Sequence, residues 1–126
     1  MSSVIKSFNT PDITIEPPLT RVDICNLGTA KASRLRVQPG WKWSTCIKSI
    51  AKTESCRVRH VGCLIKGHLH IKMDDGTDID IKEGDAYVIE PGHDGWVVGD
   101  SEVEGYEFET KLANTNKSFE DIIYKQ

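Results

Sequence analysis

Apolar and polar residues alternate with a period of about two through the middle of the chain. One such stretch places five residues on the same face: Cys56, Val58, His60, Gly62 and Leu64. The next stretch follows Gly67 and alternates Leu69, Ile71 and Met73 with His68, His70 and Lys72. Because successive side chains of a strand point to opposite faces, both stretches predict strands with one buried face. The same alternation turns His68 and His70 toward solvent.

Turn residues separate these strands at short intervals. Asp74-Asp75-Gly76 and Glu83-Gly84 are typical of hairpin turns, and short apolar runs follow at 87–89, 96–98 and 106–108. Short strands with a turn roughly every 8–12 residues predict an all-β sandwich or barrel.

The two ends of the chain differ from this middle part. Residues 1–20 contain three prolines and few apolar residues, which predicts an extended arm. Such an arm could close an edge of its own sheet or pair with a neighbouring subunit. Residues 44–55 predict a loop, and 118–124 predict a short C-terminal helix capped by Ser118. We therefore expect three regions: an arm at 1–20, a β-barrel at 21–112 and a C-terminal segment at 113–126.

Composition narrows the class of protein. A chain of 126 residues predicts one domain, and a net charge of −3 with interspersed signs argues against nucleic-acid binding. Apolar runs are too short for a membrane span, and the N-terminus lacks the build of a signal peptide. We therefore expect a cytoplasmic protein whose four cysteines are thiols.

The run from His60 to Trp96 resembles the two conserved motifs of the cupin superfamily, reading HVGCLIKGHLHIKMDDGTDIDIKEGDAYVIEPGHDGW. Gly67, Gly84 and Gly92 fit the turn glycines of these motifs. A tryptophan-containing strand with GDAYVIEPGHDGW is also similar to histidine-poor cupins linked to ureidoglycine and ethanolamine metabolism. The resemblance implies a double-stranded β-helix, which is the jelly-roll barrel of cupins. It also implies a homodimer formed through an outer sheet edge and the arm.

The metal-ligand positions of that family carry other residues in this chain. His60 stands where the family has a glutamate, and His93 lies two residues before the expected histidine of the second motif. The remaining ligand positions fall on Thr53 and Ser55, or Glu54 and Cys56, in the first motif and on Gly95 in the second. The usual His-His-Glu-His set is therefore degenerate here.

A shifted metal site is the sharpest hypothesis that these residues allow. Residues two apart on a strand share a face, so Glu54, Cys56 and His60 could face the interior together, and His93 could complete the set. A carboxylate, a thiolate and two imidazoles suit one divalent metal ion, either zinc or iron. The alternative is that Cys56 is a small buried hydrophobe and His60 a hydrogen-bonded core histidine.

Aromatic residues and one predicted loop add further candidates. Trp41, Trp43 and Trp96 are expected at the mouth or wall of the barrel, where they could stack on a ligand, and core packing is the alternative. His93 and Asp94 form the best acid–base pair, because a flanking carboxylate can orient an imidazole. His60 is a third catalytic candidate.

Taken together, the residues predict a protein that binds a small polar metabolite inside the barrel. The expected pocket is lined by Trp43, Cys56, His60, His93 and Trp96. A non-standard divalent metal would support hydrolase, isomerase or lyase chemistry there. The rival hypothesis is a metal-free sensor or binding module without turnover.

Overall fold

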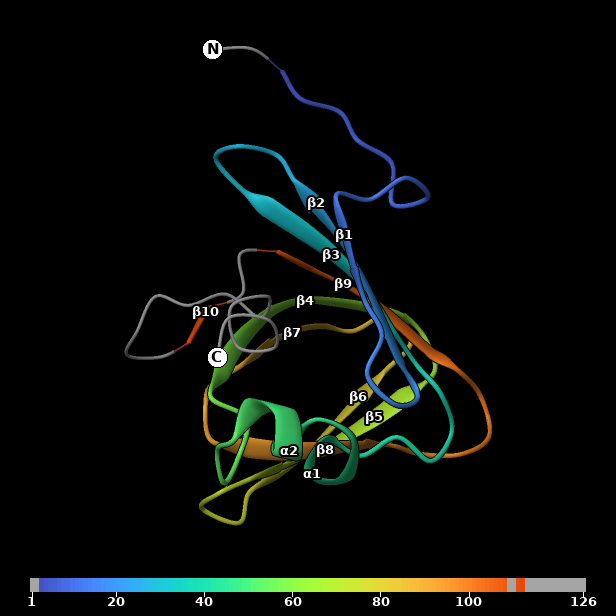
Figure 1. The fold of residues 1–126 in the computed structure, drawn as a ribbon. Coiled ribbons are helices and arrows are strands. Elements are labelled where there is room, and N and C mark those ends of the chain that lie inside the picture. The colour runs from blue at the N-terminus through green and yellow to red at the C-terminus, as the bar shows by residue number, and fades with distance from the viewer. Residues whose placement is uncertain (1–2, 109–110, 113–126) are drawn as a thin grey trace.

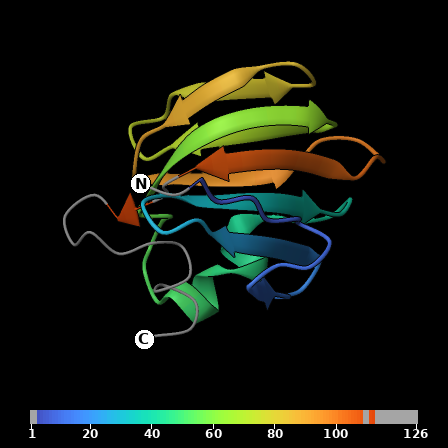
Figure 2. The same cartoon turned by 90° about the horizontal axis from the view of Figure 1, so that it is seen from above.

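The computed structural model describes residues 3–108 and 111–112, which form two antiparallel sheets that face each other (Figure 1). The larger sheet has the strand order β1-β2-β3-β9-β4-β10, with β7 also paired to β4, and the smaller sheet has the order β6-β5-β8. The strand bounds are β1 Ile13–Ile15, β2 Thr20–Asn26, β3 Lys31–Val37, β4 Val58–Lys66, β5 His68–Met73, β6 Asp78–Lys82, β7 Ala86–Ile89, β8 His93–Val97, β9 Val103–Phe108 and β10 Lys111–Leu112. Figure 2 shows β7, β4, β9, β3 and β2 side by side in the larger sheet.

The core lies between the two sheets and follows the predicted alternation. Leu64 on β4 is fully buried, and Leu69 and Ile71 on β5 are 5% and 4% exposed. His68 and His70 lie on the other face of β5, where they bond to Asp78 and Asp80 of β6. The prediction of an all-β fold is therefore confirmed. Burial of one face of each strand also fixes the register in which the strands pair.

The segment predicted as a loop at 44–55 contains two helical turns, α1 (Trp43–Cys46) and α2 (Lys48–Ala51). In Figure 1 these turns lie together beside β8. They belong to a second apolar cluster made by Trp43, Cys46, Ile47, Ala51, Cys56 and Val58. The sequence does not reveal them because one turn is too short to show a helical period. No helix in the described part of the chain is long and apolar enough to cross a membrane.

The predicted arm contributes a strand to its own sheet. β1 pairs antiparallel with β2, with Ile15 opposite Val22, and so covers that sheet edge. The strand β2 begins at Thr20, the last residue of the predicted arm. The predicted C-terminal helix at 118–124 lies outside the described residues.

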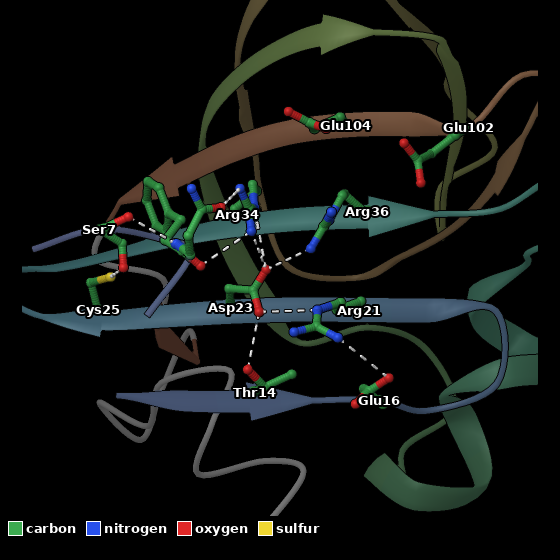
Figure 3. Close-up of polar contacts among 12 residues, drawn as sticks. Ser7, Thr14, Glu16, Arg21, Asp23, Cys25, Arg34, Arg36, Glu102 and Glu104 are labelled. Carbon is green, nitrogen blue, oxygen red and sulfur yellow. Dashed lines mark hydrogen bonds and ion pairs between the residues drawn. The ribbon is translucent and has the colours of Figure 1, made fainter. Parts of the chain in front are cut away.

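A buried carboxylate joins β1, β2 and β3 at one edge of the larger sheet (Figure 3). Asp23 on β2 has a fully buried side chain, and its Oδ2 atom accepts hydrogen bonds of 2.9 Å from Arg34 and from Arg36 on β3. Its Oδ1 atom accepts from Thr14 of β1 at 3.0 Å and from Arg21 at 3.2 Å. One carboxylate thus links three neighbouring strands, which is why its loss should be costly.

Candidate functional site

A cavity of about 60 Å³ lies inside the barrel and is lined by residues from both sheets. Most of its wall is apolar, formed by side chains such as Val22, Leu35, Trp41, Trp43, Leu69, Ile71 and Ile89. A polar group also lines it, consisting of Cys56, His60, Tyr87, His93 and Glu107. The volume is several times that needed for one water, so it has room for a small molecule.

Cys56, His60 and His93 form a compact group on this cavity. One potential ligand atom from each of the three lies within 4.8 Å of the others. The Sγ atom of Cys56 is 3.6 Å from Nε2 of His60, and the two imidazole rings meet edge-on with centroids 5.3 Å apart. Within the described residues this is the group of histidine, cysteine and acidic side chains whose geometry could hold a metal ion.

Backbone contacts explain why these distant residues meet. The N–H of Cys56 donates to the carbonyl of His93 at 2.7 Å, and the N–H of Gly92 donates to the carbonyl of Cys56 at 2.7 Å. The chain before β4 is thereby tied to the start of β8. Cys56 lies two residues before β4, His60 is the third residue of β4, and both side chains line the cavity.

In His60 and in His93, the Nδ1 atom lies within hydrogen-bond distance of an acceptor oxygen. Nδ1 of His60 lies 2.8 Å from Oε1 of Glu107, whose Oε2 accepts a 2.7 Å bond from the hydroxyl of Tyr87. Nδ1 of His93 lies 2.8 Å from the carbonyl oxygen of Glu90. A carbonyl or carboxylate oxygen can only accept, so both Nδ1 atoms donate. The Nε2 atoms are then left to face the thiol or an ion.

Glu107 reaches His60 because β9 runs very close to β4. On β9 the residues Val103 and Glu107 are buried, while Phe108 is exposed. The register places Glu107 opposite Gly62, and a Cβ added at Gly62 would overlap the carbonyl oxygen of Tyr106. Glycine is therefore required where the two backbones approach this closely.

The side chains of Cys56, His60 and Glu107 shift one another's pKa values. Burial raises the pKa of the Cys56 thiol, but hydrogen bonds from His60 and His93 outweigh it and bring that pKa to about 6. Burial lowers the pKa of His60, but the adjacent Glu107 carboxylate and Cys56 raise it well above its usual value. Burial also raises the pKa of Glu107, but His60 and the Tyr87 hydroxyl outweigh this effect and hold that pKa below its usual value. A thiolate, an imidazolium and a carboxylate thus stabilise one another.

The structure corrects the predicted position of Glu54, which the sequence places with Cys56 and His60. Its side chain is 98% exposed, and its carboxylate pairs with Lys48 at 3.2 Å. The alternation does not extend back to Glu54 because α2 ends at Ala51 and Lys52 adopts a left-handed φ of 58°. Glu54 is therefore not part of the group.

Asp94 and Trp96 also lie elsewhere than expected. On β8 the buried residues are His93, Gly95 and Val97, so Asp94 and Trp96 take the other face. The Oδ1 atom of Asp94 accepts from the backbone N–H groups of Ser44 and Gly95 at 3.1 and 2.8 Å rather than orienting His93. Trp96 stacks on His70 with ring centroids 4.8 Å apart. Trp41 and Trp43, by contrast, line the cavity.

Glu107 and Tyr87 are the site residues that the sequence did not single out. The alternation of Val103, Gly105 and Glu107 could have placed the carboxylate on the inner face. The competing alternation of Tyr106 and Phe108 is equally good, so the pattern alone does not choose between them.

No protein-family model matches the sequence, and no curated protein matches it. Solved structures match the fold. The Cnp3 cupin domain of Schizosaccharomyces pombe superposes with a TM-score of 0.52 at 10% identity. The match covers 75% of this chain and 66% of that chain, so this chain spans just under two thirds of that protein's length. This chain has a cupin fold. A protein of unknown function from Rhizobium leguminosarum gives a TM-score of 0.61 at 16% identity, covering 86% and 96% of the two chains.

A third solved structure also matches the fold. The putative ethanolamine utilization protein Q of Salmonella typhimurium superposes with a TM-score of 0.52 at 13% identity, covering 75% of this chain and 71% of that one. Identity at this level shows the shared fold alone. In the present chain, His93 and Gly95 share the buried face of β8.

Proposed function

We propose that this cupin binds one zinc ion through Sγ of Cys56 and the Nε2 atoms of His60 and His93, and that it acts on a small molecule held in the cavity. The distance between Sγ of Cys56 and Nε2 of His60, 3.6 Å, carries the proposal. Tetrahedral zinc with bonds of about 2.3 Å to sulfur and about 2.0 Å to nitrogen separates two such ligands by about 3.5 Å. A thiolate with two imidazoles favours zinc over hard cations.

The surrounding residues support this use of the three side chains. Glu107 and the carbonyl of Glu90 accept from Nδ1 of the two imidazoles and so fix the rings with Nε2 toward the group. Three protein ligands leave a fourth position for a ligand from the cavity. When bound, zinc supplies Lewis acidity of the kind used by many hydrolases, isomerases and lyases.

Elemental analysis of the full chain, purified without a metal-binding tag and dialysed against zinc, tests the proposal. We expect about one zinc per chain, because three ligands in this geometry suffice for tight binding. The substitutions Cys56→Ser, His60→Gln and His93→Gln should each abolish stoichiometric loading. Cys63→Ser and His68→Gln, which change the same residue types outside the group, should keep it. Retained loading in the Cys56→Ser chain, or failure of the folded wild type to take up zinc, iron or manganese, would contradict the proposal.

The carboxylate behind His60 should tune metal affinity. We expect Glu107→Gln to weaken zinc binding by about 10–100-fold, because a neutral amide orients and polarises the imidazole less than a carboxylate does. Competition with a chelator measures the affinity, and circular dichroism checks the fold. Glu104→Gln on the outer face of the same strand is the matched control and should leave affinity unchanged. Equal affinities of the two variants would argue against a role for Glu107.

A second candidate is a metal-free binding module without turnover. One observation favours it, namely that Cys56, His60 and Glu107 compensate one another's charge without an ion. The elemental analysis separates the candidates, because only the zinc centre requires loading that depends on Cys56. A folded protein that stays metal-free but whose tryptophan fluorescence is quenched by small molecules would support the binding module.

A further inference from the structure

We infer that the ligand of this cavity is a short monoanion with a hydrocarbon body, of the class to which butyrate belongs. Its charged head binds the zinc ion, and its body lies against the apolar wall. The inference rests on the proposed function, because the head needs the zinc ion, and it adds the class of small molecule. The charge of the site selects the head, and the wall and volume of the cavity select the body.

The charge of the proposed zinc site favours an anionic head. A metal-bound cysteine is a thiolate and a metal-bound histidine is neutral, so Cys56, His60 and His93 leave one positive charge on the ion. All three side chains line the cavity. Lysine and arginine are absent among the described residues that line it, so in the loaded site the zinc ion is the cation that a ligand meets. A monoanionic head in the fourth position neutralises that charge, whereas a neutral donor does not.

Glu107 is the negative charge beside which such a head must bind. Its Oε1 atom lies 2.8 Å from Nδ1 of His60, and its Oε2 atom accepts a 2.7 Å bond from the hydroxyl of Tyr87. The carboxylate is thus separated from the Nε2 side of the imidazole by the ring itself. Because the force between charges weakens with distance, a head in direct contact with zinc is attracted more strongly than Glu107 repels it.

The same arrangement disfavours a cationic head. An ammonium group has no lone pair with which to bind zinc, and both oxygens of Glu107 are already hydrogen-bonded. The rest of the wall is mostly apolar, and a buried charge without a partner is strongly unfavourable. Of the three classes of head, the anion is therefore the one that this site suits best.

The apolar wall begins next to the polar group. Leu35 lines the cavity from β3 and lies two residues from Ser33, whose partner on β9 is Glu107. Leu69 and Ile71 line it from β5 on the smaller sheet. One short molecule can therefore contact zinc with its head and hydrocarbon side chains with its body, which are favourable surroundings for methylene groups.

The volume limits the body to a few carbon atoms. A cavity of about 60 Å³ accommodates about five non-hydrogen atoms, judged by the space that one water needs. Each methylene group removed from water should tighten binding by about fourfold. Affinity should therefore rise by about tenfold from acetate to butyrate. It should fall again for octanoate, whose chain is longer than the cavity can hold.

Nuclear magnetic resonance of the methyl-labelled full chain tests the inference, once elemental analysis has measured the zinc content. Binding is followed through the methyl signals of Leu35 and Ile71. We expect butyrate to bind the zinc-loaded chain at least about tenfold more tightly than butyramide, which has the same shape without the charge. Butylammonium should also bind more weakly than butyrate. Metal-free protein should bind butyrate at least about tenfold more weakly than the loaded protein.

Loading the chain with cobalt(II) shows whether the head reaches the metal ion. Cobalt(II) accepts the same thiolate and imidazole ligands as zinc but absorbs visible light, so its spectrum changes when a new ligand binds it. We expect butyrate to change the spectrum saturably, with the same dissociation constant that the methyl signals give. A spectrum that does not respond while the methyl signals move would place the head away from the metal and overturn the inference.

Substitutions at Leu35 test the place of the body. Leu35→Phe adds volume to the wall without removing a metal ligand, so it should weaken butyrate binding by at least about fivefold and leave zinc loading unchanged. Val88→Phe adds similar volume at an exposed position of β7 and should change neither. The indole signals of the three tryptophans show whether each variant is folded. If Leu35→Phe does not fold, Leu35→Ala replaces it and should shift the preferred chain length from butyrate toward hexanoate.

The outcomes separate the inference from the proposed zinc site. Zinc loading with equal binding of butyrate and butyramide overturns the inference alone, and so does affinity that still rises from butyrate to octanoate. Equal binding of butyrate by metal-free and zinc-loaded protein also overturns it, because the His60 imidazolium would then hold the head. Zinc loading without binding of any probe overturns the ligand class and leaves the metal site standing. A folded chain that takes up no zinc overturns both.

Discussion

Replacing Gly62 with alanine should destabilise the fold by about 3 kcal/mol and separate Glu107 from His60, because added volume at a tightly packed site forces the backbone to move. The new Cβ would overlap the carbonyl oxygen of Tyr106 and lie 2.9 Å from Cγ and 3.1 Å from Cα of Glu107. Relief requires β9 to move away from β4, since the obstructing atoms include backbone. Urea denaturation followed by circular dichroism measures the stability, and zinc affinity reports on the separated pair.

Gly95 provides the matched control within a strand. A Cβ added there lies 2.9 Å from Cδ1 of Ile71, the end of a flexible side chain, and 3.4 Å from the carbonyl oxygen of His70. Gly95→Ala should therefore cost about 1 kcal/mol, because a side chain can adjust where a backbone cannot. Equal losses of stability in the two variants would contradict the close approach of β4 and β9.

The second large effect is expected from Asp23→Asn, which should lower the free energy of unfolding by about 3 kcal/mol at neutral pH. The substitution keeps the shape of the side chain but removes the charge that three guanidinium groups share. The side chains of Arg34 and Arg36 are only 15% and 27% exposed, so water compensates them poorly. Urea denaturation measures the loss, and Asp100→Asn, at an exposed position, should change stability little.

The contribution of Asp23 to stability should be lost as pH falls. Burial raises the pKa of Asp23, but hydrogen bonds from Arg34, Thr14 and Arg36 and the charge of Arg21 hold it below its usual value of 3.8. A carboxyl group with a depressed pKa in the folded state stabilises the protein above the unfolded pKa and loses that contribution as pH falls through the folded one. The difference between wild type and Asp23→Asn should be constant above about pH 5 and shrink below about pH 4. A constant difference down to pH 2 would contradict this.

The alternation of residues predicted much of the barrel and part of the site. Cys56 and His60 were expected on one face, and the strand β4 does turn His60 toward the cavity. The prediction was wrong for Trp96 because Trp96, Val97 and Val98 are all apolar, so either frame of β8 satisfies the pattern. A shift of one residue then exchanges the two faces of a strand. The homodimer, the small-molecule ligand and the cytoplasmic location remain predictions.

By itself the sequence determined the all-β class, the turn glycines of a cupin barrel and the faces of β4 and β5, because those features depend on residues close together in the chain. Only the tertiary structure decided that Glu107, 47 residues beyond His60, binds its imidazole, and that Glu54 and Trp96 do not join the group. Those outcomes depend on the register between distant strands and on where one helical turn ends. Both are set by packing across the whole barrel, which no local pattern records.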